Sequence, residues 1–205
     1  MISPAPPGRN LPDEPFQIAI LLYPGVTALD AVGPWEVFSR LPDTEVRFVG
    51  KELGPLESEG GTLLLGVTHT TADTPSPDLV LVPGGTTTPS QMVDDEILDW
   101  LRQVHETTTW TASVCTGALI LGAAGILKGL PATTHWWKMN VLKILGAEPR
   151  AHDHIVRSGK VVTAAGVSAG MRSFMMSLAS SRTRGDALLR RPVSKGGRGS
   201  YSIVS

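Results

Sequence analysis

Cys115, the only cysteine of the chain, stands where a β-prone apolar run meets a helical one. The apolar run 110–114 precedes it and 118–126 has helical composition, while small residues lie two positions before it (Ser113) and two after it (Gly117). This pattern predicts a nucleophile elbow, a sharp strand-to-helix turn. A thiol at a helix N-terminus is expected to have a lowered pKa and to act as a nucleophile. The alternative is a buried structural cysteine.

Three polar residues are candidates to act beside this thiol. Asp30 lies in the apolar segment ALDAVGPWEVF, where burial would raise its pKa and let it deliver a proton; the alternative is a helix N-cap. Thr116 offers a hydroxyl, or serves its local backbone. His135, at a predicted strand end, is either a partner of the cysteine in acyl transfer or a hydrogen-bonded structural residue.

Two glycines and a His-Asp-His run complete the candidates. Gly84 and Gly85 follow the apolar strand predicted at 78–82. They either let backbone N–H groups face an anion or only form a turn. The run at 152–154 has two histidines on one strand face and no evident third ligand, so we expect no metal.

Strands and helices alternate along the chain, which predicts a largely parallel sheet covered on both faces. The carboxyl ends of its strands would bring together the loops that carry Asp30, Gly84, Cys115 and residues 166–167. The expected strands are 16–23, 45–49, 62–65, 78–82, 110–114 and 130–134, with a hairpin of 154–157 and 160–164. The expected helices are one within 27–40 with Pro34 near its start, 94–106 with Asp94 as N-cap, 136–145 and 169–180, and 53–61 reads as turns.

The 205 residues, 41% hydrophobic and 18% charged, predict one main domain. We expect a disordered lead at 1–14, an α/β domain at 15–181 and a basic, weakly ordered tail at 182–205. The formal net charge of −1 argues against nucleic-acid binding, although residues 171–205 hold seven of the 18 basic residues. The absence of a signal-peptide pattern, of an apolar run of about 18 residues and of a second cysteine predicts a cytoplasmic, non-membrane protein.

The segments LLYPGVTALDAVGPWEVF, LVLVPGG, SVCTGALILGAAGILKGLPATTHW and TAAGVSAG, in this order and spacing, resemble the ThiJ/PfpI superfamily. This resemblance spans about 16–170 and implies its class I glutamine-amidotransferase-like fold, a flavodoxin-like three-layer α/β sandwich with a mostly parallel sheet. The pair Asp30 and Thr116 is similar to the isocyanide hydratase branch, since many other members have glutamate, and some histidine, at these positions. The same pair also occurs in sensing domains of AraC-type regulators.

The resemblance implies that Cys115 is the nucleophile, Asp30 the general acid/base and Thr116 a polar partner. It also implies that the backbone N–H of Val167 bonds the thiolate, that the chain forms a homodimer and that no cofactor is needed. The implied reaction is a hydro-lyase reaction that converts a small-molecule isocyanide to an N-substituted formamide through a cysteine thioimidate. The residues expected at the substrate or oxyanion are Gly84, Gly85, Val167 and His135.

Three other interpretations stay open. One is another thiol activity of the superfamily, such as glyoxalase or deglycase, or a chaperone role. A second is a stand-alone ligand sensor, although no pair of helices here resembles a helix-turn-helix. The third is an inactive product, because the family continues as a long amphipathic helix after Gly170, whereas this sequence loses all pattern by divergence or by a reading-frame change.

Overall fold

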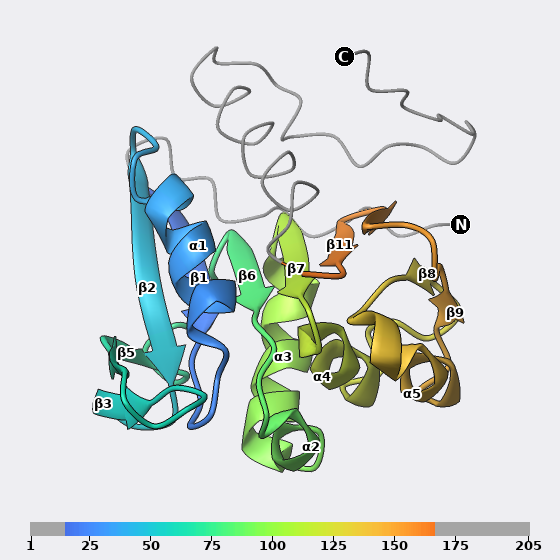
Figure 1. Cartoon of the computed structure of the whole chain (residues 1–205). Helices are drawn as coiled ribbons and strands as arrows, with labels where there is room; N and C mark the ends of the chain where they lie inside the picture. Colours follow the sequence, from blue (N-terminus) through green and yellow to red (C-terminus); the bar gives the residue numbers. More distant parts are fainter. Residues whose placement is uncertain (1–14, 167–205) are drawn as a thin grey trace, which may run out of the picture.

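The structure, a computed structural model, describes residues 15–166. A seven-stranded sheet runs in the order β10-β11-β7-β6-β1-β2-β5 (Figure 1). Neighbouring strands are parallel except β10 and β11, so the predicted mostly parallel sheet is confirmed.

The strands are β1 (Phe16–Leu21), β2 (Thr44–Gly50), β3 (Gly54–Glu57), β4 (Leu64–Val67), β5 (His69–Thr70), β6 (Leu79–Val82), β7 (Trp110–Val114), β8 (Pro131–Ala132), β9 (Glu148–Pro149), β10 (Ile155–Ser158) and β11 (Val161–Ala164). The helices are α1 (Ala28–Phe38), α2 (Thr88–Gln91), α3 (Asp95–Thr107), α4 (Gly117–Ala123), the 3₁₀ helix η1 (Trp136–Lys138) and α5 (Met139–Ile144).

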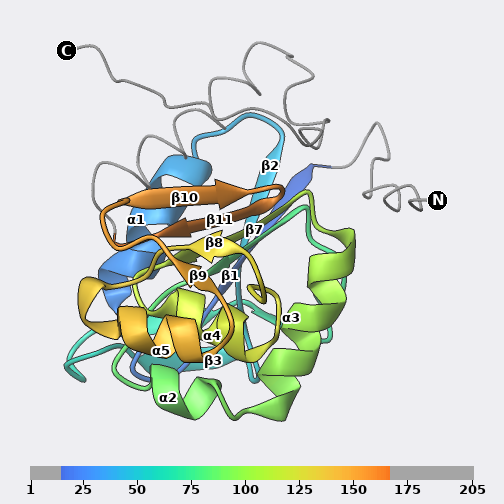
Figure 2. The same cartoon turned by 90° about the vertical axis from the view of Figure 1, so that its right-hand side faces the viewer.

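The central strands β1, β6 and β7 are almost entirely buried, as their continuous apolar sequences predict. Right-handed crossovers place α1 on one face of the sheet and α3 and α4 on the other (Figures 1 and 2). The parallel register aligns Ile20 with Leu81 and Val82 with Ser113. The three strands therefore end at one edge, where the loops that follow them meet.

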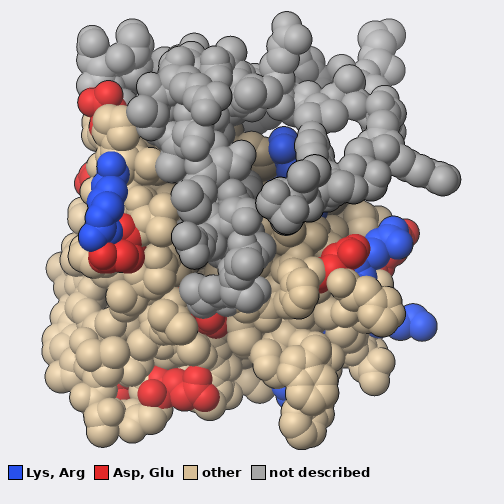
Figure 3. Space-filling model, turned by 45° about the horizontal axis from the view of Figure 1, so that its top comes forward, with Lys and Arg blue, Asp and Glu red and all other residues tan. Residues whose placement is uncertain are grey.

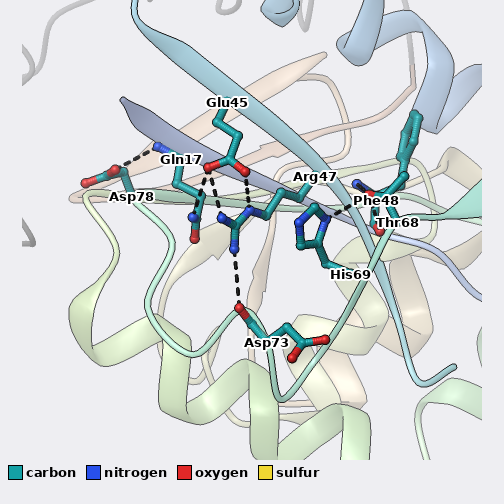
Figure 4. Close-up of polar contacts among 8 residues, drawn as sticks. All are labelled: Gln17, Glu45, Arg47, Phe48, Thr68, His69, Asp73 and Asp78. Carbon is teal, nitrogen blue, oxygen red and sulfur yellow. Dashed lines mark hydrogen bonds and ion pairs between the residues drawn. The ribbon is translucent and has the colours of Figure 1, made fainter. Parts of the chain in front are cut away.

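A polar network holds β1, β2 and the start of β6 together (Figure 4). The Arg47 guanidinium pairs with Glu45 at 2.7 Å and donates to the Asp73 carbonyl at 3.3 Å. The backbone N–H of Gln17 donates to the Asp78 carboxylate at 2.8 Å. Gln17, Glu45 and Asp78 lie near the amino ends of β1, β2 and β6, so this network is separate from the carboxyl edge of the sheet.

Charged side chains of both signs lie next to one another on the face drawn in Figure 3. Exposed ion pairs such as Arg40–Glu36 and Arg150–Glu148 belong to this kind of surface, where water and salt screen the attraction and little stability is gained. No helix in the described part of the chain has the length and apolar character needed to cross a membrane.

The first helix differs from its prediction. It begins at Ala28, so Pro34 lies inside it and not near its start. Asp30 is in the first turn, and the N-cap is Thr27. Because Thr27 occupies the N-cap position, the N-cap alternative for Asp30 is wrong, and the Asp30 side chain is available for another role. Proline lacks the N–H that would bond the carbonyl four residues earlier, so Pro34 makes no such bond to the Asp30 carbonyl.

Two other segments were assigned wrongly. The stretch 53–61 was expected to be turns, but it contains β3, which pairs antiparallel with β4 in a separate hairpin. The glycines that favoured turns lie at its margins, where Gly54 and Gly60 have positive φ. The expected helix 136–145 is divided into η1 and α5, and the expected strand 130–134 shortens to β8.

The strand expected at 62–65 lies two residues later, as β4, and the other assignments within residues 15–166 are confirmed with ends that shift by one to three residues. Asp94 caps α3 by accepting from the backbone N–H of Ile97 at 3.4 Å. The hairpin of β10 and β11 turns through Gly159, whose φ is +60°. The expected lead at 1–14, the helix at 169–180, the tail at 182–205 and Val167 lie outside the described residues.

Candidate active site

Cys115 joins β7 to α4 with a φ of +55°, a backbone conformation that residues other than glycine rarely adopt. Its backbone N–H donates to the Ala164 carbonyl at the end of β11 at 2.9 Å. A Cβ on Gly117 would lie 2.0 Å from the Val82 carbonyl oxygen, and one on Gly84 would lie 2.7 Å from the Thr116 nitrogen. The turn is packed backbone against backbone, as the small residues around the cysteine predict.

We expect Gly117→Ala to lower the free energy of unfolding by at least about 2 kcal/mol, because the new methyl group must displace the backbone of β6. Urea denaturation measures the change. Gly66→Ala is the matched control, since a Cβ there meets nothing within 4 Å, and its effect should stay within about 0.5 kcal/mol. Equal stabilities of the two variants would contradict the close packing at the turn.

Asp30 is 4% exposed and faces the cysteine. Its carboxylate accepts from the backbone N–H of Gly84 at 3.2 Å and from the thiol of Cys115. Burial raises the pKa of Asp30 to about 6, against the lowering effect of these two hydrogen bonds. The carboxyl is therefore mostly ionised at neutral pH and close to the point at which it can hold a proton.

The expected lowering of the cysteine pKa is wrong for this structure. Burial of the half-buried sulfur, and next the Asp30 charge, raise the pKa of Cys115 to about 11. Hydrogen bonds from the backbone N–H and the hydroxyl of Thr116 act in the opposite direction but are smaller effects. The helix that follows is only seven residues long, and desolvation outweighs it. At neutral pH the pair therefore consists of a thiol and a carboxylate joined by one proton.

One expected role of the two glycines after β6 was to offer free backbone N–H groups to an anion. The structure does not support this role, because both N–H groups already have partners. The N–H of Gly84 is bonded to Asp30, and the N–H of Gly85 donates to the Thr116 hydroxyl oxygen at 3.1 Å. Thr27 donates its N–H to the Gly84 carbonyl at 2.8 Å, which ties the loop after β1 to the loop after β6. The glycines thus orient the acid and the threonine beside the thiol.

Comparison with known proteins assigns the chain to a family. The model of the DJ-1/PfpI family matches residues 16–180. The chain belongs to the DJ-1/PfpI family. It is 44% identical over 164 residues to isonitrile hydratase of Pseudomonas putida, an alignment that covers 80% of this chain and 71% of that protein.

Solved structures agree with the DJ-1/PfpI assignment. A ThiJ/PfpI family protein from Pseudomonas syringae aligns with a TM-score of 0.76 at 34% identity, over 91% of this chain and 79% of that one. Drosophila melanogaster DJ-1beta aligns with a TM-score of 0.73 at 16% identity, over 84% of this chain and 96% of that one, and shows the fold alone. The expected superfamily and its mostly parallel α/β fold are confirmed.

His135 follows Thr134, a residue that contacts the nucleophile elbow. The Thr134 hydroxyl donates to the Cys115 carbonyl at 2.8 Å, while the His135 ring packs against Trp136. Within residues 15–166 no hydrogen bond is found between the His135 ring and the cysteine or Asp30. A role for His135 at the substrate stays a prediction, and so does the role of Val167. Among the described residues, no group of three or more His, Cys, Asp or Glu side chains is placed to hold a metal ion.

Two residues near the thiol were missed by sequence reasoning. Thr88 is 2% exposed and lies 2.8 Å from the Thr116 hydroxyl, oxygen to oxygen. Tyr23 is 2% exposed, and its phenol donates to the Pro83 carbonyl at 2.9 Å. Thr88 is one of three consecutive threonines, and nothing in the sequence distinguishes it from the other two. Only the fold shows that its hydroxyl faces Thr116.

A cavity of about 420 Å³ opens between the segment that follows β1, the strand β3 and the helix α3, and Tyr23 forms part of its wall. Cys115 and Asp30 are not among its lining residues, so it is separate from the thiol. Its lining consists of Leu22, Tyr23, Pro24, Lys51, Glu52, Leu53, Gly54, Pro55, Leu56, Val67, Gln91, Asp94 and Ile97.

Proposed function

We propose that this protein hydrates isocyanides to N-substituted formamides through a thioimidate on Cys115. The observation that carries the proposal is the buried Asp30 carboxylate that accepts a hydrogen bond from the Cys115 thiol. The 44% identity to an isonitrile hydratase supports the same reaction. In this proposal the active unit is a homodimer, as the resemblance to the family implies.

The first half of the reaction transfers the thiol proton to carbon. Asp30 takes the proton from Cys115 as the sulfur bonds to the terminal carbon of the isocyanide, and Asp30 then gives that proton to the same carbon. The product is the thioimidate R–N=CH–S, with no net change of charge. Because Asp30 has a pKa of about 6, it can both accept and return the proton near neutral pH.

The second half consumes one water molecule. Asp30 takes a proton from water as the oxygen bonds to the thioimidate carbon, and it gives that proton to the nitrogen. Asp30 then takes the remaining hydroxyl proton as the carbon–sulfur bond breaks, returns it to the sulfur, and R–NH–CHO leaves. The hydroxyl and N–H of Thr116, which hydrogen-bond the sulfur, stabilise negative charge on it when the bond forms and breaks.

Incubation of the purified protein with para-nitrophenyl isocyanide tests the proposal. We expect the corresponding formamide, detected by chromatography and mass spectrometry, to form in many equivalents per protein. Intact mass measured after rapid acid quenching should show a fraction of protein heavier by one isocyanide. A ligand sensor would bind the compound without turnover, and a glyoxalase-like enzyme would act on dicarbonyls; either result with no formamide would overturn the proposal.

The pH dependence of turnover follows from the two pKa values. The active form needs Asp30 ionised and Cys115 protonated, because the carboxylate must accept the thiol proton. We expect kcat/KM to fall tenfold per pH unit below about 6, where Asp30 becomes protonated, and to lack a second limb up to about pH 10, below the Cys115 value of about 11. Stopped-flow assays from about pH 5 to 10 measure the profile, and constant turnover down to about pH 5 would contradict the role of Asp30.

A further inference from the structure

The hydroxyl groups of Thr88 and Thr116 form a buried pair beside the candidate nucleophile. Their oxygens are 2.8 Å apart. Thr88 is also 2.8 Å from the Gly85 carbonyl oxygen, and Thr116 also hydrogen-bonds Cys115. The backbone N–H of Gly85 donates to the Thr116 oxygen at 3.1 Å, so Thr116 keeps one donor in every arrangement.

Each hydroxyl has a single hydrogen, so these contacts cannot all be made at once. In a first arrangement Thr88 donates to the Gly85 carbonyl and Thr116 donates to Thr88. In a second arrangement Thr88 donates to Thr116, and Thr116 donates to the Cys115 sulfur. Rotation of the two O–H bonds converts one arrangement into the other without moving a heavy atom.

Tyr23 does not compete as a donor to this pair. Its phenol donates to the Pro83 carbonyl at 2.9 Å and lies 3.4 Å from the Thr88 oxygen. Burial raises its pKa far above the usual value, so it keeps its proton. Tyr23 can therefore offer only a lone pair to Thr88, over a distance too long for a strong hydrogen bond.

We propose that Thr88 is a positioning residue that holds the Thr116 hydrogen while Cys115 is a thiol and releases it to the sulfur when the sulfur becomes a thiolate. A thiol sulfur is a weak acceptor, so the first arrangement is favoured while the proton stays on sulfur. A thiolate is a charged acceptor, for which a donor is worth more. The pair thereby stabilises the sulfur mainly after Asp30 has taken its proton, which is the condition for faster reaction.

This inference deepens the proposed function and rests on it only for its catalytic meaning. The ionisable group that acts on the sulfur is Asp30 from α1. The phenol of Tyr23, which follows β1, is affected by the sulfur, and Glu59 acts on both Asp30 and Tyr23. A substitution at Thr88 leaves all three in place. A change in thiol ionisation can then be assigned to the hydroxyl pair.

Thr88→Val, which keeps the side-chain shape and removes the hydroxyl, tests the proposal. The thiol form would lose two hydroxyl hydrogen bonds and the thiolate form only one, so the thiol form loses more. We expect the pKa of Cys115 to fall by about half a unit to one unit. Alkylation by iodoacetamide near pH 8 should then be about two- to fourfold faster, after allowance for the lower nucleophilicity of a less basic thiolate. Because the chain has one cysteine, the rate reports this sulfur alone.

Two further variants make the test specific. Thr116→Val removes the donor itself and should slow alkylation, whereas Thr88→Ser restores a hydroxyl and should return the rate to that of the unmodified sequence. If Thr88→Val slows alkylation or leaves it unchanged while remaining folded, the proposal is wrong. If Thr88→Val does not fold, the rate of Thr88→Ala decides by the same criterion. Alkylation needs no isocyanide, so failure of this proposal and failure of the proposed function give different results.

Discussion

Cys115→Ala is expected to abolish the conversion of para-nitrophenyl isocyanide to its formamide, with a loss of at least about 10³-fold. The thioimidate cannot form without the sulfur, and no second cysteine exists to replace it. Initial rates followed at saturating isocyanide measure the effect. Intact mass measured during turnover should show no adduct on the variant.

Ser113→Ala is the matched control for the loss of Cys115. The Ser113 hydroxyl is buried and has no hydrogen-bond partner among the described residues, so its removal should leave turnover and stability close to those of the unmodified sequence. If Cys115→Ala retained turnover while folded like the control, covalent catalysis by this residue would be excluded.

Asp30→Asn is expected to move two measurements in opposite directions. Turnover should fall by about 10²- to 10⁴-fold, because the amide cannot accept the thiol proton or return it to carbon. Alkylation of Cys115 should become faster at neutral pH, because the Asp30 charge and its hydrogen bond both raise the thiol pKa. Loss of structure at the site would also expose the thiol and speed its alkylation, because burial is the largest cause of its raised pKa. The combination therefore counts only if urea denaturation shows that Asp30→Asn is as stable as the unmodified sequence.

Asp73→Asn is the control for the loss of a carboxylate. Asp73 bonds the hydroxyl and N–H of Thr70 at the surface, and its replacement should affect neither turnover nor alkylation. Unchanged turnover in Asp30→Asn would remove Asp30 from the mechanism. Slower alkylation in that variant would show that Asp30 lowers the thiol pKa, contrary to the geometry described here.

The sequence allowed correct prediction of the parallel sheet and of the edge at which its loops meet. The buried runs that form β1, β6 and β7 are continuous and apolar, and each is followed by a loop or a first helical turn that carries a candidate residue. The hairpin of β3 and β4 was missed because Gly54 and Gly60 are typical of turns. The start of α1 was misplaced because Pro34 reads as a first-turn residue, although it lies inside the helix.

The electrostatics of the site could not be predicted from the sequence. A cysteine before a helical segment indicated a low thiol pKa, but the sign depends on how deeply the sulfur is buried and on which charge faces it. Asp30 is 85 positions away in the chain, and only the parallel register brings it to the sulfur. The partnership of Thr88 and Thr116 depends equally on the fold, while Val167 and the homodimer stay predictions.

The φ of +55° at Cys115 limits which nucleophiles this scaffold can carry. A residue branched at Cβ crowds its own carbonyl group in that conformation, at a cost of about 1–3 kcal/mol. Threonine is therefore a poor replacement, whereas serine fits the same backbone. In proteins built on this turn, we therefore expect residues that are unbranched at Cβ at the position of Cys115. New reactivity then has to come from the groups around that position.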